Sequence, residues 1–300
     1  MSYLVGVDLG GSSIKAVAAT REGRALDQAR LEFQPGRRLE WAGKIRGVLA
    51  QFAAKQGVAP DAIGISAPGL ASQDERSIAV MPGRLEGLEG LDWTTFLNSP
   101  RPVPVLNDAH AALLGESWLG AAKGFRNVIL LTLGTGVGGA ALVDGRLLRG
   151  HLGRAGHLGH ASLDIDGPPD VCRIPGSLEW AIGNWSIAER TGGRFGSTHD
   201  LVAAHLGGDA DASRIWLRSV RALACAIASF VNILDPEAVI VGGGIAAAGS
   251  ALFDPLKGFV EAIEWQPGGH RVRIAPATLG ELAGAFGAAH RAGMRDPNNQ

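Results

Sequence analysis

The chain opens with an apolar run that ends in a glycine turn. Residues 3–9 are almost wholly apolar, as expected for a buried strand, and Gly10, Gly11, Ser12 and Ser13 follow. The same reading of apolar runs and turn residues predicts the next elements. They are strands over 14–19 and 25–33, a helix over 39–56, strands over 62–66 and 103–106, and a helix from 107 to about 119.

This opening pattern then recurs about 125 residues further along the chain. An apolar run over 127–133 is followed by a glycine turn at 134–139 and strands over 140–143 and 146–148. Helices are predicted over much of 178–234 and over 282–292, and strands over 238–241 and 271–275. The repetition predicts a duplicated α/β lobe.

Two lobes with a cleft between them follow from this duplication. We expect mixed sheets flanked by helices, with residues 1–120 and the C-terminal segment 282–300 in the first lobe. Residues 121–281 form the predicted second lobe. No low-complexity linker marks the boundary, which is placed near 118–126.

Composition and charge limit the kinds of molecule that the protein is expected to bind. The 300 residues are 46% hydrophobic and 19% charged, and 28 basic against 29 acidic residues leave a net charge of -1. This balance gives no general attraction to nucleic acid or to an anionic membrane. Cys172 and Cys225 form no disulfide framework, and no signal peptide is evident, so we expect a cytoplasmic protein.

The two glycine turns are candidate phosphate sites. A glycine-rich turn after a buried strand exposes backbone N–H groups to which phosphate oxygens can bind, although turn formation alone also explains glycine. Residues 134–139 match G-x-G-x-x-G, but a strand follows instead of a helix, which argues against a dinucleotide fold. If the lobes face each other, the two turns approach one nucleotide's phosphates from both sides.

Three side chains carry candidate chemistry. Asp8 is suited to holding hydrated Mg²⁺, or alternatively to capping a strand end. Lys15 can reach a phosphate, or it can be an outward-facing strand lysine. Asp108, after Asn107 at a predicted helix start, is either part of an N-cap or the base that orients and deprotonates an attacking hydroxyl.

Together these motifs resemble the ROK family of sugar kinases, in the hexokinase/actin-like ATPase superfamily. The resemblance covers nearly the whole chain and rests on motifs that occur in the family's order. They are Asp8-Leu-Gly-Gly-Ser12, Asn107-Asp108-Ala109, Leu133-Gly-Thr-Gly-Val-Gly-Gly-Ala140, Gly156-His-Leu-Gly-His160, Gly176-Ser-Leu-Glu179 and Val241-Gly-Gly-Gly244.

The resemblance implies two actin-like, ribonuclease H-like lobes and an ATP- and Mg²⁺-dependent kinase acting on a hexose. Transfer to the 6-hydroxyl of glucose, a homodimer and lobe closure on the sugar are family expectations. Asp108 is then the catalytic base, and the sugar contacts are Asn107, Asp108, His160 and Glu179. The residues expected around ATP are Gly10, Gly11, Ser12, Lys15, Gly134, Thr135, Gly136, Gly138, Gly242, Gly243 and Gly244.

The chain departs from the family at three places. His157 stands where the family often has a sugar-binding Glu, and some N-acylmannosamine kinases of the family also carry His there. Because His can donate a hydrogen bond where a carboxylate only accepts, an N-acyl hexosamine is the alternative substrate, and a solvated loop histidine is the alternative role. The family's Pro-Asn-Leu is replaced within residues 81–85, which puts one sugar contact in doubt.

The third departure concerns zinc. The spacing of the family's zinc site, His with Cys-x-Cys-x4-Cys, here gives His160, Asp170, Cys172 and Ser177. Two thiolates are missing, and Ser is a poor zinc ligand, so we predict no bound zinc.

Two further readings stay open beside the ATP-dependent kinase. One is a non-catalytic sugar-binding regulator, since the family includes repressors that carry an N-terminal helix-turn-helix. We expect no such domain here, because Asp8 lies seven residues after Met1. The other is a kinase that uses polyphosphate as its donor.

Overall fold

The computed structural model describes residues 2–34, 39–81 and 85–294. The chain divides into two compact units, of which the first comprises residues 1–124, 149–155 and 278–300 and the second residues 125–148 and 156–277. Residues 295–300, which we assigned to the first lobe, lie outside the described part.

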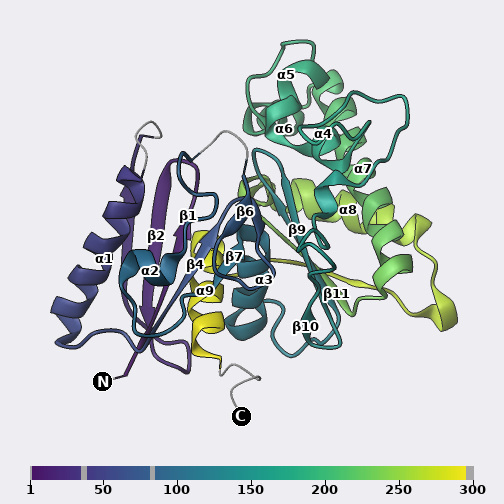
Figure 1. The fold of residues 1–300 in the computed structure, drawn as a ribbon. Coiled ribbons are helices and arrows are strands. Elements are labelled where there is room, and N and C mark those ends of the chain that lie inside the picture. The colour runs from purple at the N-terminus through teal and green to yellow at the C-terminus, as the bar shows by residue number, and fades with distance from the viewer. Residues whose placement is uncertain (1, 35–38, 82–84, 295–300) are drawn as a thin grey trace. The chain divides into compact units, whose positions relative to one another are not determined.

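The first unit is built on a five-stranded mixed sheet in the order β3-β2-β1-β4-β7, as far as the described residues go (Figure 1). Its elements are β1 (Leu4–Leu9), β2 (Ser13–Ala19), β3 (Ala25–Glu32), α1 (Glu40–Gln56), β4 (Ala62–Ala67), β5 (Leu70–Ala71), β6 (Ile78–Val80), α2 (Trp93–Leu97), β7 (Val105–Asn107), α3 (Asp108–Leu119), η5 (Gly280–Leu282) and α9 (Ala283–Gly293). β1 pairs antiparallel with β2 and parallel with β4, so the sheet mixes both kinds of ladder.

Alternation along β1 directs side chains to two different helical layers. Val5 and Val7 join Ile45 and Phe52 of α1 in one buried cluster, whereas Leu4 packs with residues of α9 on the other face. The pattern of the sequence missed β5, β6 and α2, because elements of two to five residues are too short to show a period.

Helix α9 packs against the sheet and against α3 (Figure 1), and glycines let the backbones come very close there. A Cβ atom at Gly6 would lie 1.8 Å from the Ala285 carbonyl oxygen, and one at Gly287 would lie 1.7 Å from the Ala111 carbonyl oxygen. Part of the high glycine content is therefore explained by close packing of backbones.

The second unit repeats the strand order of the first, with β10-β9-β8-β11-β12 in a five-stranded sheet of described residues. Its elements are β8 (Val128–Leu133), β9 (Val137–Val143), β10 (Arg146–Leu147), η1 (Leu158–His160), α4 (Leu178–Ile182), η2 (Asn184–Ser186), α5 (Ile187–Arg190), α6 (Thr198–Leu206), α7 (Ala210–Leu234), β11 (Ala238–Gly242), η3 (Gly244–Ala248), α8 (Ser250–Ile263), η4 (Pro267–Gly269) and β12 (Arg273–Pro276). The prediction of mixed sheets flanked by helices in a duplicated α/β chain is confirmed.

Helix α7 is long and apolar enough to cross a membrane by length and composition alone. Its apolar side, however, is buried in the core of the second unit, where Trp216, Val220 and Leu223 are fully covered. Arg218 and Arg221 are exposed on its other side. This division is typical of a core helix in a globular protein.

Segment 149–155 belongs to the first unit although both flanking segments belong to the second. Arg149 donates from Nη1 to Glu75 Oε1 at 2.9 Å and from Nη2 to the Ser72 carbonyl oxygen at 2.7 Å. Gln73 Nε2 donates to the carbonyl oxygens of Gly150 and His151. These bonds join residues more than 70 positions apart, so no local pattern indicates them.

Candidate active site

Asp8 lies at the end of β1, beside the first glycine turn. It is opposite Lys15 on β2 and Ser66 on β4, and the Ser66 hydroxyl donates to Asp8 Oδ1 at 2.6 Å. The pKa of Asp8 is raised to about 6, mainly by burial and also by the charge of Asp108, while the hydrogen bond from Ser66 and the charge of Lys15 act to lower it. Asp8 and Asp108 thus form an electrostatically coupled pair of carboxylates.

The first glycine turn presents exposed backbone. Gly10 N–H closes the turn on the Ser13 carbonyl oxygen at 2.8 Å, and Gly11 and Ser12 are exposed. Lys15 Nζ lies 3.8 Å from Glu281 Oε2, so in this structure the lysine has a carboxylate partner. The turn can receive an anion, whereas Lys15 would first have to leave Glu281.

Asn107 takes the N-cap role that was considered for this dipeptide. The buried Asn107 is the N-cap of α3, because its Oδ1 accepts from Ala109 N at 3.0 Å and from His110 N at 3.3 Å, while its Nδ2 donates to the Gly69 carbonyl oxygen. Asp108 is the first residue of the helix and is exposed. The cap therefore leaves the Asp108 carboxylate accessible at a helix N-terminus, which favours its ionised form.

The second glycine turn is shorter than predicted. We expected a turn over 134–139 and a strand from 140, but β9 begins at Val137, and Gly138 pairs with Thr132 within the sheet. Only residues 134–136 form the turn, closed by a 2.9 Å bond from Gly134 N to the Gly136 carbonyl oxygen. The prediction was wrong because glycine serves packing here: a Cβ at Gly139 would lie 2.7 Å from Leu158 Cβ.

Helix α4 and the segment after it hold this turn in place. The buried Glu179 accepts from Val137 N at 2.9 Å through Oε2. Asn184 N donates to the Gly134 carbonyl oxygen at 3.0 Å, and Trp185 N donates to the Thr135 carbonyl oxygen at 2.9 Å. Glu179, predicted as a sugar contact, thus also supports the turn, and Asn184 and Trp185 are positioning residues that the sequence pattern missed.

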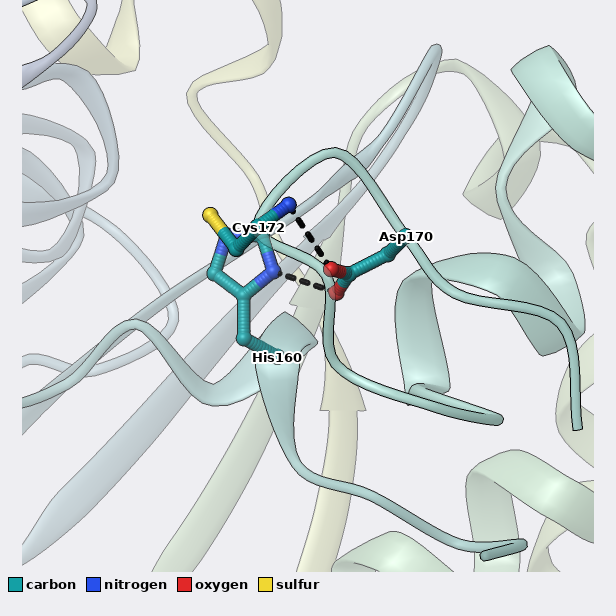
Figure 2. A group of neighbouring side chains, drawn as sticks. All are labelled: His160, Asp170 and Cys172. Carbon is teal, nitrogen blue, oxygen red and sulfur yellow. Dashed lines mark hydrogen bonds and ion pairs between the residues drawn. The ribbon is translucent and has the colours of Figure 1, made fainter. Parts of the chain in front are cut away.

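The loop that carries the two candidate sugar-binding histidines is also held by a carboxylate. His157, partly buried, immediately precedes η1. His160 Nδ1 lies 2.7 Å from Asp170 Oδ2, and Asp170 Oδ1 accepts from Cys172 N at 2.8 Å (Figure 2). The Asp170 carboxylate therefore fixes both the ring of His160 and the turn that follows Asp170.

His160, Asp170 and Cys172 place their ligand atoms within 4.8 Å of one another, but this group does not match a structural zinc site. Both oxygens of Asp170 already accept hydrogen bonds. Burial raises the pKa of the Cys172 thiol, which disfavours the thiolate that zinc requires. Ser177, the fourth residue of the expected zinc spacing, is the N-cap of α4, and its Oγ accepts from Trp180 N. The absence of zinc stays a prediction.

Burial works to raise the pKa of Asp170, but hydrogen bonds from His160, Ile174, Ser177 and Cys172 outweigh burial and hold that pKa below its ordinary value. Asp170 is therefore ionised at neutral pH. It can hold the loop by charge-assisted hydrogen bonds.

The third glycine group closes β11. Gly243 has φ of 86°, and a Cβ atom there would lie 2.3 Å from the Leu133 carbonyl oxygen. Gly242 ends the strand and Gly244 begins η3. The replaced family motif falls largely on residues 82–84, which lie outside the described residues.

The model of the ROK family matches residues 4–293. The chain belongs to the ROK family. Glucokinase of Halalkalibacterium halodurans is 32% identical, over 95% of this chain and 93% of that protein. N-acetylmannosamine kinase of Yersinia pseudotuberculosis is 30% identical, over 94% of this chain and 96% of that protein.

Solved structures resemble this ROK protein over nearly its whole length. The ROK hexokinase of Thermus thermophilus is 31% identical with a TM-score of 0.86, and the alignment covers 97% of each chain. The ROK glucokinase of Streptomyces griseus, solved with glucose and AMPPNP, is 27% identical with a TM-score of 0.77, over 97% of this chain and 99% of that one. The resemblance to sugar kinases of this family and to their fold is thereby confirmed.

Proposed function

We propose that this ROK protein transfers the γ-phosphoryl group of ATP to a hexose hydroxyl, the 6-hydroxyl of glucose. One observation carries the proposal: Asp108 is exposed at the N-terminus of α3 and couples electrostatically to Asp8 beside an exposed glycine turn. Glucokinase relatives that align over nearly the whole chain support glucose as the acceptor.

In this proposal Asp108 aligns the acceptor hydroxyl and takes its proton. The hydroxyl oxygen forms a bond to the γ-phosphorus, the bond from that phosphorus to the β–γ bridging oxygen breaks, and ADP leaves. Such a transfer depends on alignment and charge neutralisation more than on a strong base, so an ordinary ionised carboxylate suffices. The N-terminus of α3 helps to keep Asp108 ionised.

Asp8 is the residue that would hold Mg²⁺, through water. Its carboxylate fits a hard cation, and Ser66 already fixes one of its oxygens. When bound, the ion would supply positive charge against the phosphate oxygens.

The remaining contacts follow the backbone turns and the loop of histidines. We propose that the turns at 10–12 and 134–136 bind phosphate oxygens through their N–H groups and that residues 242–244 lie near the adenosine. Asn107, His157, His160 and Glu179 are the proposed sugar contacts. Asn107 can offer only the remaining Nδ2 hydrogen, since its oxygen caps α3.

Replacement of Asp108 tests the proposal. Asp108→Asn keeps the shape of the side chain and removes its charge, so we expect kcat for glucose to fall by a factor of about 10² to 10⁴ with little change in the melting temperature. A coupled assay of ADP release measures kcat. The control is Asp254→Asn, which neutralises an exposed carboxylate on α8. Turnover near the wild-type level in Asp108→Asn would exclude Asp108 as the base.

A second candidate is phosphorylation of an N-acyl hexosamine. His157 favours it, because an imidazole N–H can donate to an acyl oxygen where the family's carboxylate cannot. The N-acetylmannosamine kinase relative is consistent with this reading. Values of kcat/KM for glucose, mannose, N-acetylglucosamine and N-acetylmannosamine decide between the two. If none of these sugars is phosphorylated, the sugar-binding regulator is favoured instead. If phosphorylation occurs only when polyphosphate is supplied, polyphosphate and not ATP is the donor.

The setting of the enzyme is also a proposal. We propose a cytoplasmic homodimer that binds a sugar and ATP and neither nucleic acid nor membrane. The balanced charge of the chain and the burial of α7's apolar side support this setting.

A further inference from the structure

The second unit contains a cavity of about 640 Å³ whose lining includes none of the residues proposed for the kinase reaction. It is lined by residues of α4, the end of α5 and α7, together with the loop after η1. Its size is within the range of small-molecule pockets. The cavity therefore has room for a ligand the size of a small metabolite.

Four arginines line this cavity against one acidic residue. Arg214, Arg218 and Arg221 follow one another on α7 at spacings that place them on one face of the helix, and Arg190 comes from α5. Asp164 is the acidic lining residue. Because the whole chain has a net charge of -1, this positive charge is a local feature of the cavity.

Arg190 is held in a fixed orientation by neutral partners. Its Nε donates to Ser186 Oγ at 3.0 Å, its Nη1 to Ser219 Oγ at 2.7 Å and its Nη2 to the Gly183 carbonyl oxygen at 2.9 Å. A guanidinium has five N–H donors, so two remain after these three bonds. Among the described residues no carboxylate pairs with Arg190.

This arginine is a partly buried cation. Burial lowers the pKa of Arg190 to about 10, so it stays charged at neutral pH without a counter-ion from the described residues. Such a charge is costly unless an anion compensates it. The fixed guanidinium is thus preorganised for an anionic partner.

The arginines of α7 are exposed, and they also have unused hydrogen-bonding capacity. Within the described ranges, Arg218 and Arg221 form no ion pair, and Arg214 Nη2 lies 3.6 Å from the exposed Asp211. The apolar lining comes from Leu163, Trp180 and Ile215. The cavity therefore combines guanidinium groups for an anion with apolar surface for the rest of a molecule.

We propose that this cavity binds a small phosphorylated anion, with its phosphate on the arginines and its less polar part against the apolar lining. Arginine matches phosphate because its planar N–H groups form paired charge-assisted hydrogen bonds to phosphate oxygens. Four guanidinium groups against one carboxylate favour a dianion over a singly charged carboxylate. This site is separate from the phosphoryl-transfer residues and does not depend on the proposed kinase activity.

Calorimetric titration with inorganic pyrophosphate at constant ionic strength tests the proposal. The test variant is Arg218→Gln/Arg221→Gln, which leaves both glycine turns and the hydrogen bonds of Arg190 intact. We expect pyrophosphate affinity at the cavity to fall about tenfold for each arginine removed. The control Lys257→Gln removes one exposed positive charge from α8, which does not line the cavity, and should bind as the wild type does.

Any binding at the glycine turns is common to all three proteins, so the difference between wild type and double variant reports the cavity. Equal pyrophosphate binding in wild type and double variant would overturn the proposal. A second result would also overturn it: the wild type binds no pyrophosphate, and the double variant loses self-association in sedimentation velocity. The arginines would then contact a second copy of the chain.

Discussion

Asp8 is ionised at neutral pH only at a cost in stability. Its pKa of about 6 exceeds the value of 3.8 expected in the unfolded chain, so between these pH values the folded state binds more protons. The contribution of Asp8 to the free energy of unfolding therefore rises as pH falls from 6 to 4.

Asp8→Asn should remove this dependence. We expect the variant to be more stable than the wild type by about 3 kcal/mol above pH 7, with the difference disappearing near pH 4. Urea denaturation across this range measures it. A difference that is the same at every pH would show that Asp8 is not perturbed as described.

His157 is the residue on which sugar preference is expected to turn. His157→Glu restores the residue that the family often has and replaces a donor by an acceptor. We expect the ratio of kcat/KM for N-acetylmannosamine to that for glucose to fall by about tenfold, the effect of one polar contact.

The control for this exchange is His199→Glu, which makes the same change at an exposed position of α6 that is not among the proposed sugar contacts. An unchanged ratio in His157→Glu would mean that the side chain does not face the sugar.

Gly243, directly after β11, has a backbone conformation and a close contact that require glycine. Gly243→Ala places a Cβ atom at a positive φ and against the Leu133 carbonyl oxygen, so we expect it to destabilise the protein by at least about 2 kcal/mol. Gly244→Ala is the matched control, because a Cβ there meets no atom within 4 Å. Chemical denaturation should separate the two variants; equal stabilities would contradict this account.

The glycines also show why helices, strands and turns were easier to predict than the role of each residue within them. The clusters at 10–11 and 134–136 do form turns, yet Gly138 and Gly139 belong to a strand. Gly6 and Gly287 permit helix α9 to contact β1 and α3. The sequence shows only that a glycine has no side chain. Which neighbouring group excludes a side chain there is known only from the tertiary structure.

Glu116, fully buried on α3, ties distant segments of the first unit together. Its Oε1 accepts from Thr278 N and Leu279 N, and its Oε2 accepts from Ala121 N and Thr278 Oγ1, at 2.7 to 3.1 Å. These bonds anchor the part of the chain that leads into α9. Nothing in the sequence around Glu116 marks it, because its partners at 278–279 are far away along the chain.

Glu116→Gln should destabilise the protein by about 2–4 kcal/mol, since an amide NH₂ would face two donors and leave them without an acceptor. Urea denaturation measures the loss, and Glu189→Gln on the exposed side of α5 is the control. A loss below about 0.5 kcal/mol, typical of surface changes, would contradict this role.

The sequence by itself determined the duplicated α/β units, the order of most strands and helices, the position of Asp108 at a helix start and the family. These features are local or repeated: apolar periodicity, turn residues and capping are encoded within a few neighbouring positions.

Only the tertiary structure decided which distant groups meet. The coupling of Asp8 to Asp108, the support of the second glycine turn by Glu179, the contact between His160 and Asp170 and the arginine-lined cavity all join separate elements. Burial and electrostatic coupling depend on three-dimensional neighbours, which a linear pattern of residue types does not specify.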